Sequence, residues 1–93
     1  MKPVRLTRHA REQCAERGAT EEEVLLAVER GRREPAKYGR VLGRCNTAFW
    51  GIWSGGFYTV KQVAPVIAEE PHEIVVVTVY TFYFSDKGSF GED

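Results

Sequence analysis

Apolar positions in the first third of the chain recur with a helical spacing. Leu6, Ala10 and Cys14 are four residues apart, and this spacing places their side chains on one face of a helix. Thr7 stands directly before the run, where a hydroxyl can accept a hydrogen bond from an amide of the first turn. The pattern therefore predicts a helix over residues 7–17.

A second helix is predicted over residues 20–30. Thr20 and Glu23 have the spacing of a capping box, in which each side chain bonds the backbone amide of the other residue. The apolar face of this helix is formed by Val24, Leu25, Ala27 and Val28. Because the connection between the helices is very short, they form an αα-hairpin, which needs a sheet beneath it to bury its apolar faces.

Beyond a basic link at residues 32–35 the pattern becomes extended. Strands are predicted over residues 37–43, 47–53, 57–67 and 73–84. Residues 74–84 read IVVVTVYTFYF, and this run of β-branched and aromatic side chains predicts a central strand that is covered on at least one face. Ser54-Gly55-Gly56 predicts a tight hairpin turn, whereas Pro65 cannot donate to a strand ladder and predicts an edge or a bulge.

The order α-α-β-β-β-β with short links predicts a single α+β domain over residues 1–93. Its N-terminal αα-hairpin packs on one face of a curved antiparallel sheet of three to four strands, and residues 85–93 form a tail that frays. The strand region holds too many aromatic side chains for one small core, so we expect some of them on the opposite sheet face. They are Phe49, Trp50, Trp53, Tyr58, Tyr80, Phe82 and Tyr83.

The charges are unevenly distributed along the chain, although the formal net charge is zero. Residues 1–44 carry eleven Lys and Arg against seven Glu, and residues 45–93 carry two Lys against six acidic residues. A basic half beside an acidic half is what a polyanion site next to a partner surface would show. The alternative is solvated charge with no binding role.

Composition limits the class of protein. A hydrophobic fraction of 43% is that of a globular domain. No stretch reaches the ~20 apolar residues that span a bilayer, and the N-terminal residues lack the apolar core of a signal peptide. We therefore expect a cytoplasmic protein without a membrane partner. Cys14 and Cys45 lack metal-ligand spacing and are expected to be reduced thiols, and no motif predicts a metal or a cofactor.

A polar stripe of His9, Gln13 and Arg17 runs parallel to the apolar stripe of the first helix. A neutral imidazole exchanges protons near pH 7, and a guanidinium binds phosphate oxygens in a fork. The combination suits a phosphodiester site that uses no metal. The alternative is that His9 packs at the helix start and that Arg17 pairs with a neighbouring carboxylate, which would be Glu12, Glu16 or Glu21.

A second group of basic residues follows the helices. It comprises Arg32, Arg33, Lys37, Arg40 and Arg44. In an antiparallel sheet these side chains could line the same groove as Tyr80, and basic residues interleaved with Tyr38 and the tryptophans are typical of a surface for single-stranded nucleic acid. The alternative is that residues 30–33 only satisfy the C-terminus of the second helix. His72 follows a proline in an acidic turn, where a histidine is normally solvated.

The stretch LTRHAREQCAERGATEEEVLLAVERG resembles the N-terminal signature of the family called domain of unknown function 4258, and Val77-Thr78-Val79-Tyr80 resembles its closing strand. That family is similar to the RelE, ParE and BrnT toxins, which share an α-α-β sheet plan. Many of those toxins are endoribonucleases held in check by an antitoxin, whereas ParE-type members act on DNA gyrase. The resemblance makes His9 and Arg17 the signature polar pair, with Gln13 where an arginine is often found.

Two functional hypotheses follow. The first is a toxin-like, metal-independent endoribonuclease in which Arg17 and Arg44 hold the phosphate, His9 exchanges protons and Tyr80 orients the substrate or donates a proton. Gln13 and Arg40 complete the contacts with the substrate. Its candidate partners are RNA and an antitoxin protein. The second hypothesis is an interaction module without enzymatic activity, whose aromatic sheet face binds a protein or a second copy of the chain.

Overall fold

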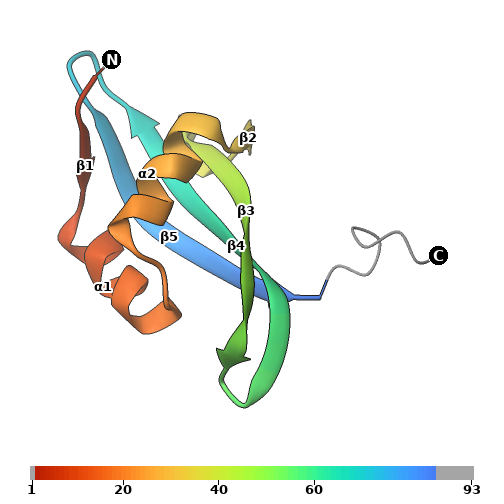
Figure 1. The fold of residues 1–93 in the computed structure, drawn as a ribbon. Helices are drawn as coiled ribbons and strands as arrows, with labels where there is room; N and C mark the ends of the chain where they lie inside the picture. The colour runs from red at the N-terminus through yellow and green to blue at the C-terminus, as the bar shows by residue number, and fades with distance from the viewer. Residues whose placement is uncertain (1, 86–93) are drawn as a thin grey trace.

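Two helices lie on one face of a five-stranded sheet in the computed structural model, which describes residues 2–85 (Figure 1). In chain order the elements are β1 (Val4–Leu6), α1 (Arg8–Arg17), α2 (Glu21–Arg30), β2 (Arg32–Pro35), a 3-10 turn (Lys37–Gly39), β3 (Val41–Trp53), β4 (Gly56–Glu69) and β5 (Ile74–Phe84). The predicted α+β class is confirmed. Both helices begin and end within one residue of their predicted bounds. Ser85 is the last described residue of the predicted tail.

The strand order is β1-β5-β4-β3-β2. β1 pairs with β5 in parallel, and all the other neighbours are antiparallel, so the sheet is mixed rather than purely antiparallel. β4 is the middle strand of the five, and β5, which was predicted to be a central strand, lies inside the sheet between β1 and β4. Pro65 lies within the ladder of β4, and the register shifts beside it, between Val66 and Ile67. This irregularity is the bulge that the proline predicted.

The strand predicted over residues 37–43 is confirmed for residues 41–43, which begin β3, and was wrong for residues 37–39. Lys37–Gly39 instead forms a 3-10 turn, because Tyr38 and Gly39 adopt positive φ angles of 63° and 72° that no strand accommodates. The residues expected to be a link, Arg32–Pro35, pair with the first residues of β3 as an edge strand. β3 itself joins the two predicted strands into one. The hairpin turn at Ser54 and Gly55 is confirmed, with positive φ angles of 51° and 87°.

The core lies between the helices and the sheet. It is formed by Leu6, Ala10, Cys14, Val24, Ala27, Val28, Val63, Ile67, Val76 and Val79. A Cβ atom at Gly43 would lie 3.0 Å from the carbonyl oxygen of Ala27, so glycine lets α2 approach β3 closely. Neither cysteine forms a disulfide, and Cys14 is buried. Among the described residues, no helix is long and apolar enough to cross a bilayer.

α1 covers the part of β5 that β1 leaves without a neighbour. β1 pairs only with residues 74–76. Further along, the Thr7 hydroxyl donates to the Val77 carbonyl at 3.3 Å and Arg17 Nη1 donates to the Val79 carbonyl at 2.8 Å. The hydroxyls of Thr81 and Tyr83 donate to the Arg17 carbonyl at 2.9 and 2.7 Å. α1 thus covers a strand edge whose carbonyl groups would otherwise lack these partners, and it fixes the position of its own polar stripe.

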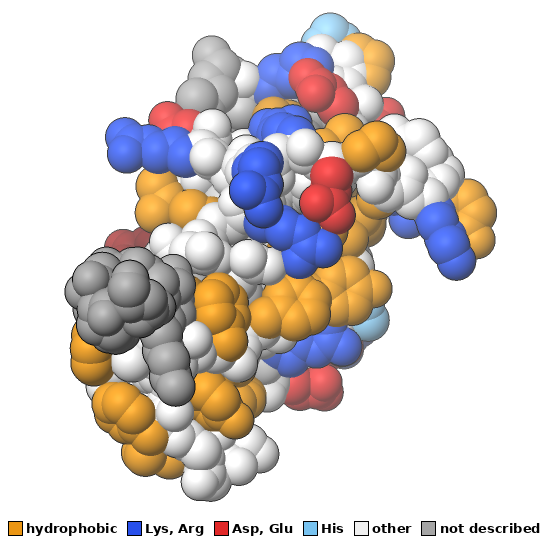
Figure 2. Space-filling model, turned by 90° about the vertical axis from the view of Figure 1, so that its right-hand side faces the viewer, with side chains coloured by type: hydrophobic (Ala, Val, Ile, Leu, Met, Phe, Trp, Pro, Cys, Tyr) orange, Lys and Arg blue, Asp and Glu red, His pale blue; other side chains and the backbone are white. Residues whose placement is uncertain are grey.

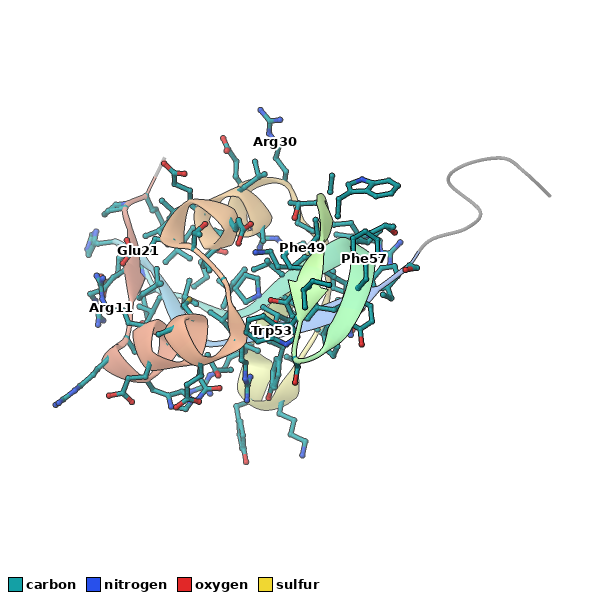
Figure 3. All side chains as sticks on the ribbon, turned by 60° about the horizontal axis from the view of Figure 1, so that its bottom comes forward. Arg11, Glu21, Arg30, Phe49, Trp53 and Phe57 are labelled. Carbon is teal, nitrogen blue, oxygen red and sulfur yellow. The ribbon has the colours of Figure 1, made fainter. Side chains whose placement is uncertain are left out.

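The predicted aromatic residues divide between two environments. Trp53 stacks on Tyr83 with ring centroids 4.8 Å apart, and Phe49 meets Tyr83 edge-on at 5.1 Å. Figure 3 shows Phe49, Trp53 and Phe57 on the hairpin of β3 and β4. Trp50, Tyr80 and Phe82 are exposed, at 56%, 43% and 43%. The expectation that part of the aromatic set lies outside the core is therefore confirmed.

Candidate functional site

The sheet face opposite the helices is open and contains a hollow of about 440 Å³, here called the central hollow. Its lining residues are Pro35, Ala36, Lys37, Tyr38, Arg40, Leu42, Val66, Val77, Thr78 and Tyr80. Val79 is buried in the core, so Thr78 and Tyr80 on either side of it point to the open face. The hollow therefore lies between β5 and the segment that joins β2 to β3.

His9 contacts Thr78, one of the residues that line the central hollow. Its Nε2 atom is 3.2 Å from the Thr78 hydroxyl, and its side chain is otherwise exposed. It does not pack at the start of the helix, because the buried residue of that turn is Ala10. The imidazole can therefore reach both solvent and a molecule bound in the hollow.

Arg17 lies over the ring of Tyr80, with Cζ 5.1 Å from the ring centroid. Apart from the bond to Val79, its side chain makes no hydrogen bond or ion pair within residues 2–85. The alternative of a pairing with Glu12, Glu16 or Glu21 does not occur. Glu12 pairs with Arg8, Glu21 pairs with Arg11, and Glu16 forms no ion pair with a described residue. Figure 3 shows Arg11 and Glu21 facing each other between the two helices. The charge of Arg17 is left uncompensated by any described carboxylate.

His9 and Arg17 reach the same strip of β5. Their contacts, Thr78 and Tyr80, are two residues apart on one strand face, which is a separation of about 6.5 Å. The Arg17 carbonyl is held by two hydroxyls, and burial raises the pKa of one of them, that of Tyr83. The end of α1, and with it the guanidinium, is thereby fixed against the strand.

Gln13 lies between His9 and Arg17 on the polar stripe but does not line the central hollow. Its side chain is half-buried, and Oε1 is buried without a hydrogen-bond partner among the residues that the structure describes. The structure does not bring this amide together with the other predicted substrate-binding residues.

Arg40 and Arg44 differ in what surrounds their charges. Arg40 lines the central hollow, with Cζ 5.7 Å from the Tyr38 ring centroid, and forms no ion pair in the described part of the chain. Arg44 forms a bidentate ion pair with Glu34, with hydrogen bonds of 3.2 and 3.1 Å. It also donates a hydrogen bond of 2.8 Å to Gln62 and lies over the ring of Phe82. The hydrogen bonds from Arg44 lower the pKa of Glu34. Arg44 is therefore largely neutralised, whereas Arg40 is not.

Among the described residues, the charges at the central hollow that no ion pair neutralises are all positive. Lys37 and Arg40 line the hollow, and Arg17 lies over Tyr80, which also lines it. Figure 2 shows Lys and Arg side chains beside hydrophobic ones on one face of the molecule. Sequence reasoning missed Thr78, although its spacing of two from Tyr80 on a predicted strand was a signal that both share a face. It also missed Glu34, whose pairing with Arg44 depends on the unpredicted strand β2.

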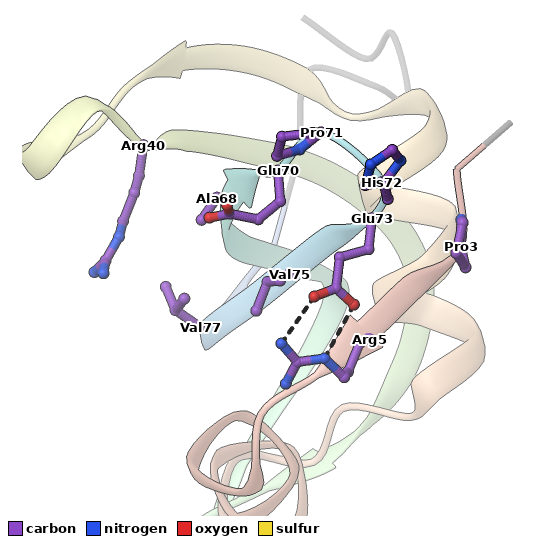
Figure 4. A pocket seen from close by; sticks show the side chains of 10 residues that line it. All are labelled: Pro3, Arg5, Arg40, Ala68, Glu70, Pro71, His72, Glu73, Val75 and Val77. Atoms are coloured by element: carbon purple, nitrogen blue, oxygen red, sulfur yellow. Dashed lines mark hydrogen bonds and ion pairs between the residues drawn. The ribbon is translucent and has the colours of Figure 1, made fainter.

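A second hollow of about 600 Å³ adjoins the first at Arg40 and Val77. Figure 4 shows Arg5 and Glu73 facing each other there, joined by two bonds of 3.1 Å. The hydrogen bonds from Arg5 lower the pKa of Glu73. Glu70 and the exposed His72 also line this hollow. Because its charges are of both signs and one arginine is already paired, it suits a polyanion less well than the central hollow does.

Comparison with known proteins identifies one family. The model of the family described as Domain of unknown function (DUF4258) matches residues 6–81, which include both helices and the residues around the central hollow. No curated protein and no solved structure matches the chain. Since the match covers most of the sequence, the chain belongs to the DUF4258 family.

Proposed function

We propose that the protein is a toxin-like, metal-independent endoribonuclease whose site is the central hollow. The observation that carries the proposal is the position of Arg17. It has no carboxylate partner in the described chain and lies on Tyr80, two residues from the Thr78 that contacts His9. An uncompensated guanidinium beside an accessible imidazole provides the two groups that phosphate chemistry requires at neutral pH.

The reaction follows from these groups. The 2′-hydroxyl of a ribose attacks the adjacent phosphorus atom while neutral His9 accepts its proton, and the P–O5′ bond breaks. The leaving 5′-oxygen takes up a proton, either from the imidazolium or from the Tyr80 hydroxyl, so that the products are a 2′,3′-cyclic phosphate and a 5′-hydroxyl. Arg17 stabilises the extra negative charge that develops on the phosphate oxygens. Arg40 and Lys37 hold neighbouring phosphates.

The wider placement of the chain with RelE, ParE and BrnT toxins belongs to this proposal. It is supported by the αα-hairpin on a mostly antiparallel sheet and by a basic site on the sheet face that the hairpin leaves open. An acidic segment of an antitoxin protein would bind the same cations and block the hollow.

The proposal is tested by RNA cleavage. We expect His9→Ala and Arg17→Ala to lower the cleavage rate by at least ~100-fold, as is usual when a general acid–base or a charge-stabilising group is removed. Arg30→Ala is the matched control, because Arg30 lies at the end of α2 and points away from the sheet (Figure 3). Equal cleavage by all variants, each shown to be folded by circular dichroism, would remove these residues from the mechanism.

A second candidate function is favoured by the tip of the β3–β4 hairpin. Ile52 and Phe57 are cross-strand partners there, and Trp50 lies 6.4 Å from Phe57 between ring centroids. All three side chains are more than half exposed. Such an apolar patch is typical of a surface that binds a second copy of the chain. Sedimentation analysis that shows a dimer abolished by Ile52→Ser and Phe57→Ser, in a protein without RNA cleavage, would favour this function.

A further inference from the structure

A short arm over the central hollow holds an aromatic ring in solvent. The arm comprises residues 36–40, and Tyr38 at its tip is 86% exposed. Its backbone lies in the left-handed region, with φ of 63° and ψ of 33°. A residue with a side chain rarely adopts this conformation, so the surrounding structure must hold Tyr38 in it.

The arm is closed by its own backbone. The Ala36 amide donates to the Arg40 carbonyl at 2.9 Å, and the Arg40 amide donates to the Lys37 carbonyl at 3.2 Å. β2 and β3 pair on either side of the arm and hold its ends together. An unusual backbone conformation that the surrounding structure enforces is often associated with a binding site.

The surroundings of Tyr38 indicate what the ring could bind. Lys37 and Arg40 flank it, neither pairs with a carboxylate among the described residues, and Arg40 Cζ lies 5.7 Å from the ring centroid. Tyr80 lines the same hollow, and the guanidinium of Arg17 lies over its ring. Exposed aromatic rings between uncompensated cations form the usual platform for an unpaired base, because the ring stacks on the base while the cations bind the flanking phosphates.

We infer that Tyr38 is a stacking platform for one nucleobase of single-stranded RNA, and that Lys37 and Arg40 bind the phosphates on either side of it. The identity of the ligand as RNA rests on the proposed function. The hollow has the volume of an ordinary ligand pocket, which is about 300 to 1,000 Å³. An RNA strand that is bound to the arm in this way extends towards Arg17 and His9. A base-paired strand cannot use the platform, because its bases are already stacked in the duplex.

The inference is tested by binding of 2′-O-methyl RNA, which cannot attack its own phosphate and so separates binding from cleavage. Fluorescence anisotropy compares a short single-stranded oligonucleotide with an abasic oligonucleotide of the same length and with the matching duplex. We expect the single strand to bind most tightly. Tyr38→Ala should weaken its binding by about 5- to 100-fold and leave binding of the abasic oligonucleotide unchanged.

Two further variants separate the ring from the backbone. Tyr38→Phe keeps the ring and should bind like the wild type. Tyr38→Gly removes the ring and also relieves the left-handed conformation, and it should bind as weakly as Tyr38→Ala. The inference would be overturned if Tyr38→Ala bound the single strand as tightly as the wild type does. It would also be overturned if Tyr38→Ala lost affinity for abasic RNA to the same extent as for the single strand.

The outcomes also distinguish this inference from the proposed function. If Tyr38→Ala binds RNA normally while His9→Ala loses cleavage, the stacking role of Tyr38 is contradicted and the catalytic role of His9 is supported. If Tyr38→Ala loses base-dependent binding while His9→Ala cleaves normally, the stacking role is supported and the mechanism is contradicted. If no RNA binds to the wild type at low salt, both are wrong.

Discussion

Gly18 shows how a single residue supports the candidate site. It ends α1 with a φ of 76°, and a Cβ atom there would lie 2.6 Å from the Tyr83 hydroxyl and 2.7 Å from the Trp53 ring. Its carbonyl accepts a bond of 2.8 Å from Lys61, whose buried ammonium also pairs with Glu23. A glycine after a helix was visible in the sequence, but the aromatic contacts that exclude a side chain at this position were not.

We expect Gly18→Ala to lower the free energy of unfolding by about 2 to 4 kcal/mol, since it combines left-handed strain with overpacking. Gly55→Ala is the matched control. Gly55 has a φ of 87°, but a Cβ atom there would meet no described atom within 4 Å, so strain alone should cost about 1 kcal/mol. Urea unfolding measures both. Equal losses of unfolding free energy in the two variants would show that Tyr83 and Trp53 move to accommodate the methyl group.

Two carboxylates connect stability to pH. Hydrogen bonds from Arg44 and Arg5 lower the pKa values of Glu34 and Glu73 below the ordinary 4.5. A depressed pKa in the folded state adds stability that is present above about pH 4.5 and is lost as the pH falls through the folded value. We expect acid to lower the unfolding midpoint below this pH. The double variant Glu34→Gln and Glu73→Gln should lose less of its stability between pH 6 and about pH 3 than the wild type. If the double variant lost as much stability between pH 6 and about pH 3 as the wild type, other titrating groups would be responsible for the acid sensitivity.

The elements differ in how far local sequence determines them. α1 and α2 were predicted within one residue because their caps and apolar spacing are local signals. β1 and β2 were missed because strands of three and four residues carry no period of their own and exist only through pairing with β5 and β3. The 3-10 turn was missed because nothing in the sequence marks Tyr38 for a left-handed backbone.

Thr7 tests the role of α1 as the cover of the β5 edge. Its hydroxyl accepts from the Ala10 amide at 3.0 Å and donates to the Val77 carbonyl at 3.3 Å. Thr20 is the matched N-cap, whose hydroxyl accepts from the Glu23 amide without bonding a strand. We expect each alanine variant to lose about 1 kcal/mol of stability, as is usual for a lost N-cap.

Thr7→Ala should in addition raise amide hydrogen exchange in α1, because this helix loses both its N-cap bond and one of its bonds to β5. Thr20→Ala should leave exchange in α1 unchanged. Equal exchange in α1 in both variants would show that neither bond of Thr7 holds the helix in place.

At the scale of the whole molecule, zero net charge conceals a local excess of positive charge. Arg17 comes from a helix, whereas Lys37 and Arg40 come from the arm between two strands. Their charges add because the fold brings Lys37 and Arg40 to the hollow and places Arg17 over Tyr80 at the same hollow, while the acidic residues that the structure describes pair elsewhere or lie outside it. A neutral protein can therefore present a binding site for a polyanion.

Three uncompensated cations predict the salt dependence of RNA binding. We expect the logarithm of the association constant to fall against the logarithm of salt concentration with a slope of about −2, at about −0.7 for each phosphate contact. Glu34→Gln should release Arg44 and steepen the slope by about 0.7. Arg30→Ala is the control and should leave the slope unchanged. Binding that is insensitive to salt in the wild type would contradict a phosphate site.

The sequence alone determined the two helices, the α+β class, the hairpin turn at Ser54 and Gly55, and a polar stripe that contains His9 and Arg17. These depend on residues within a few positions of one another, whose spacing and backbone preferences act locally. Only the tertiary structure decided the strand order, the neutralisation of Arg44 by Glu34, and the placement of the stripe against Thr78 and Tyr80. Those features depend on contacts between residues as many as 70 positions apart, which no local pattern specifies.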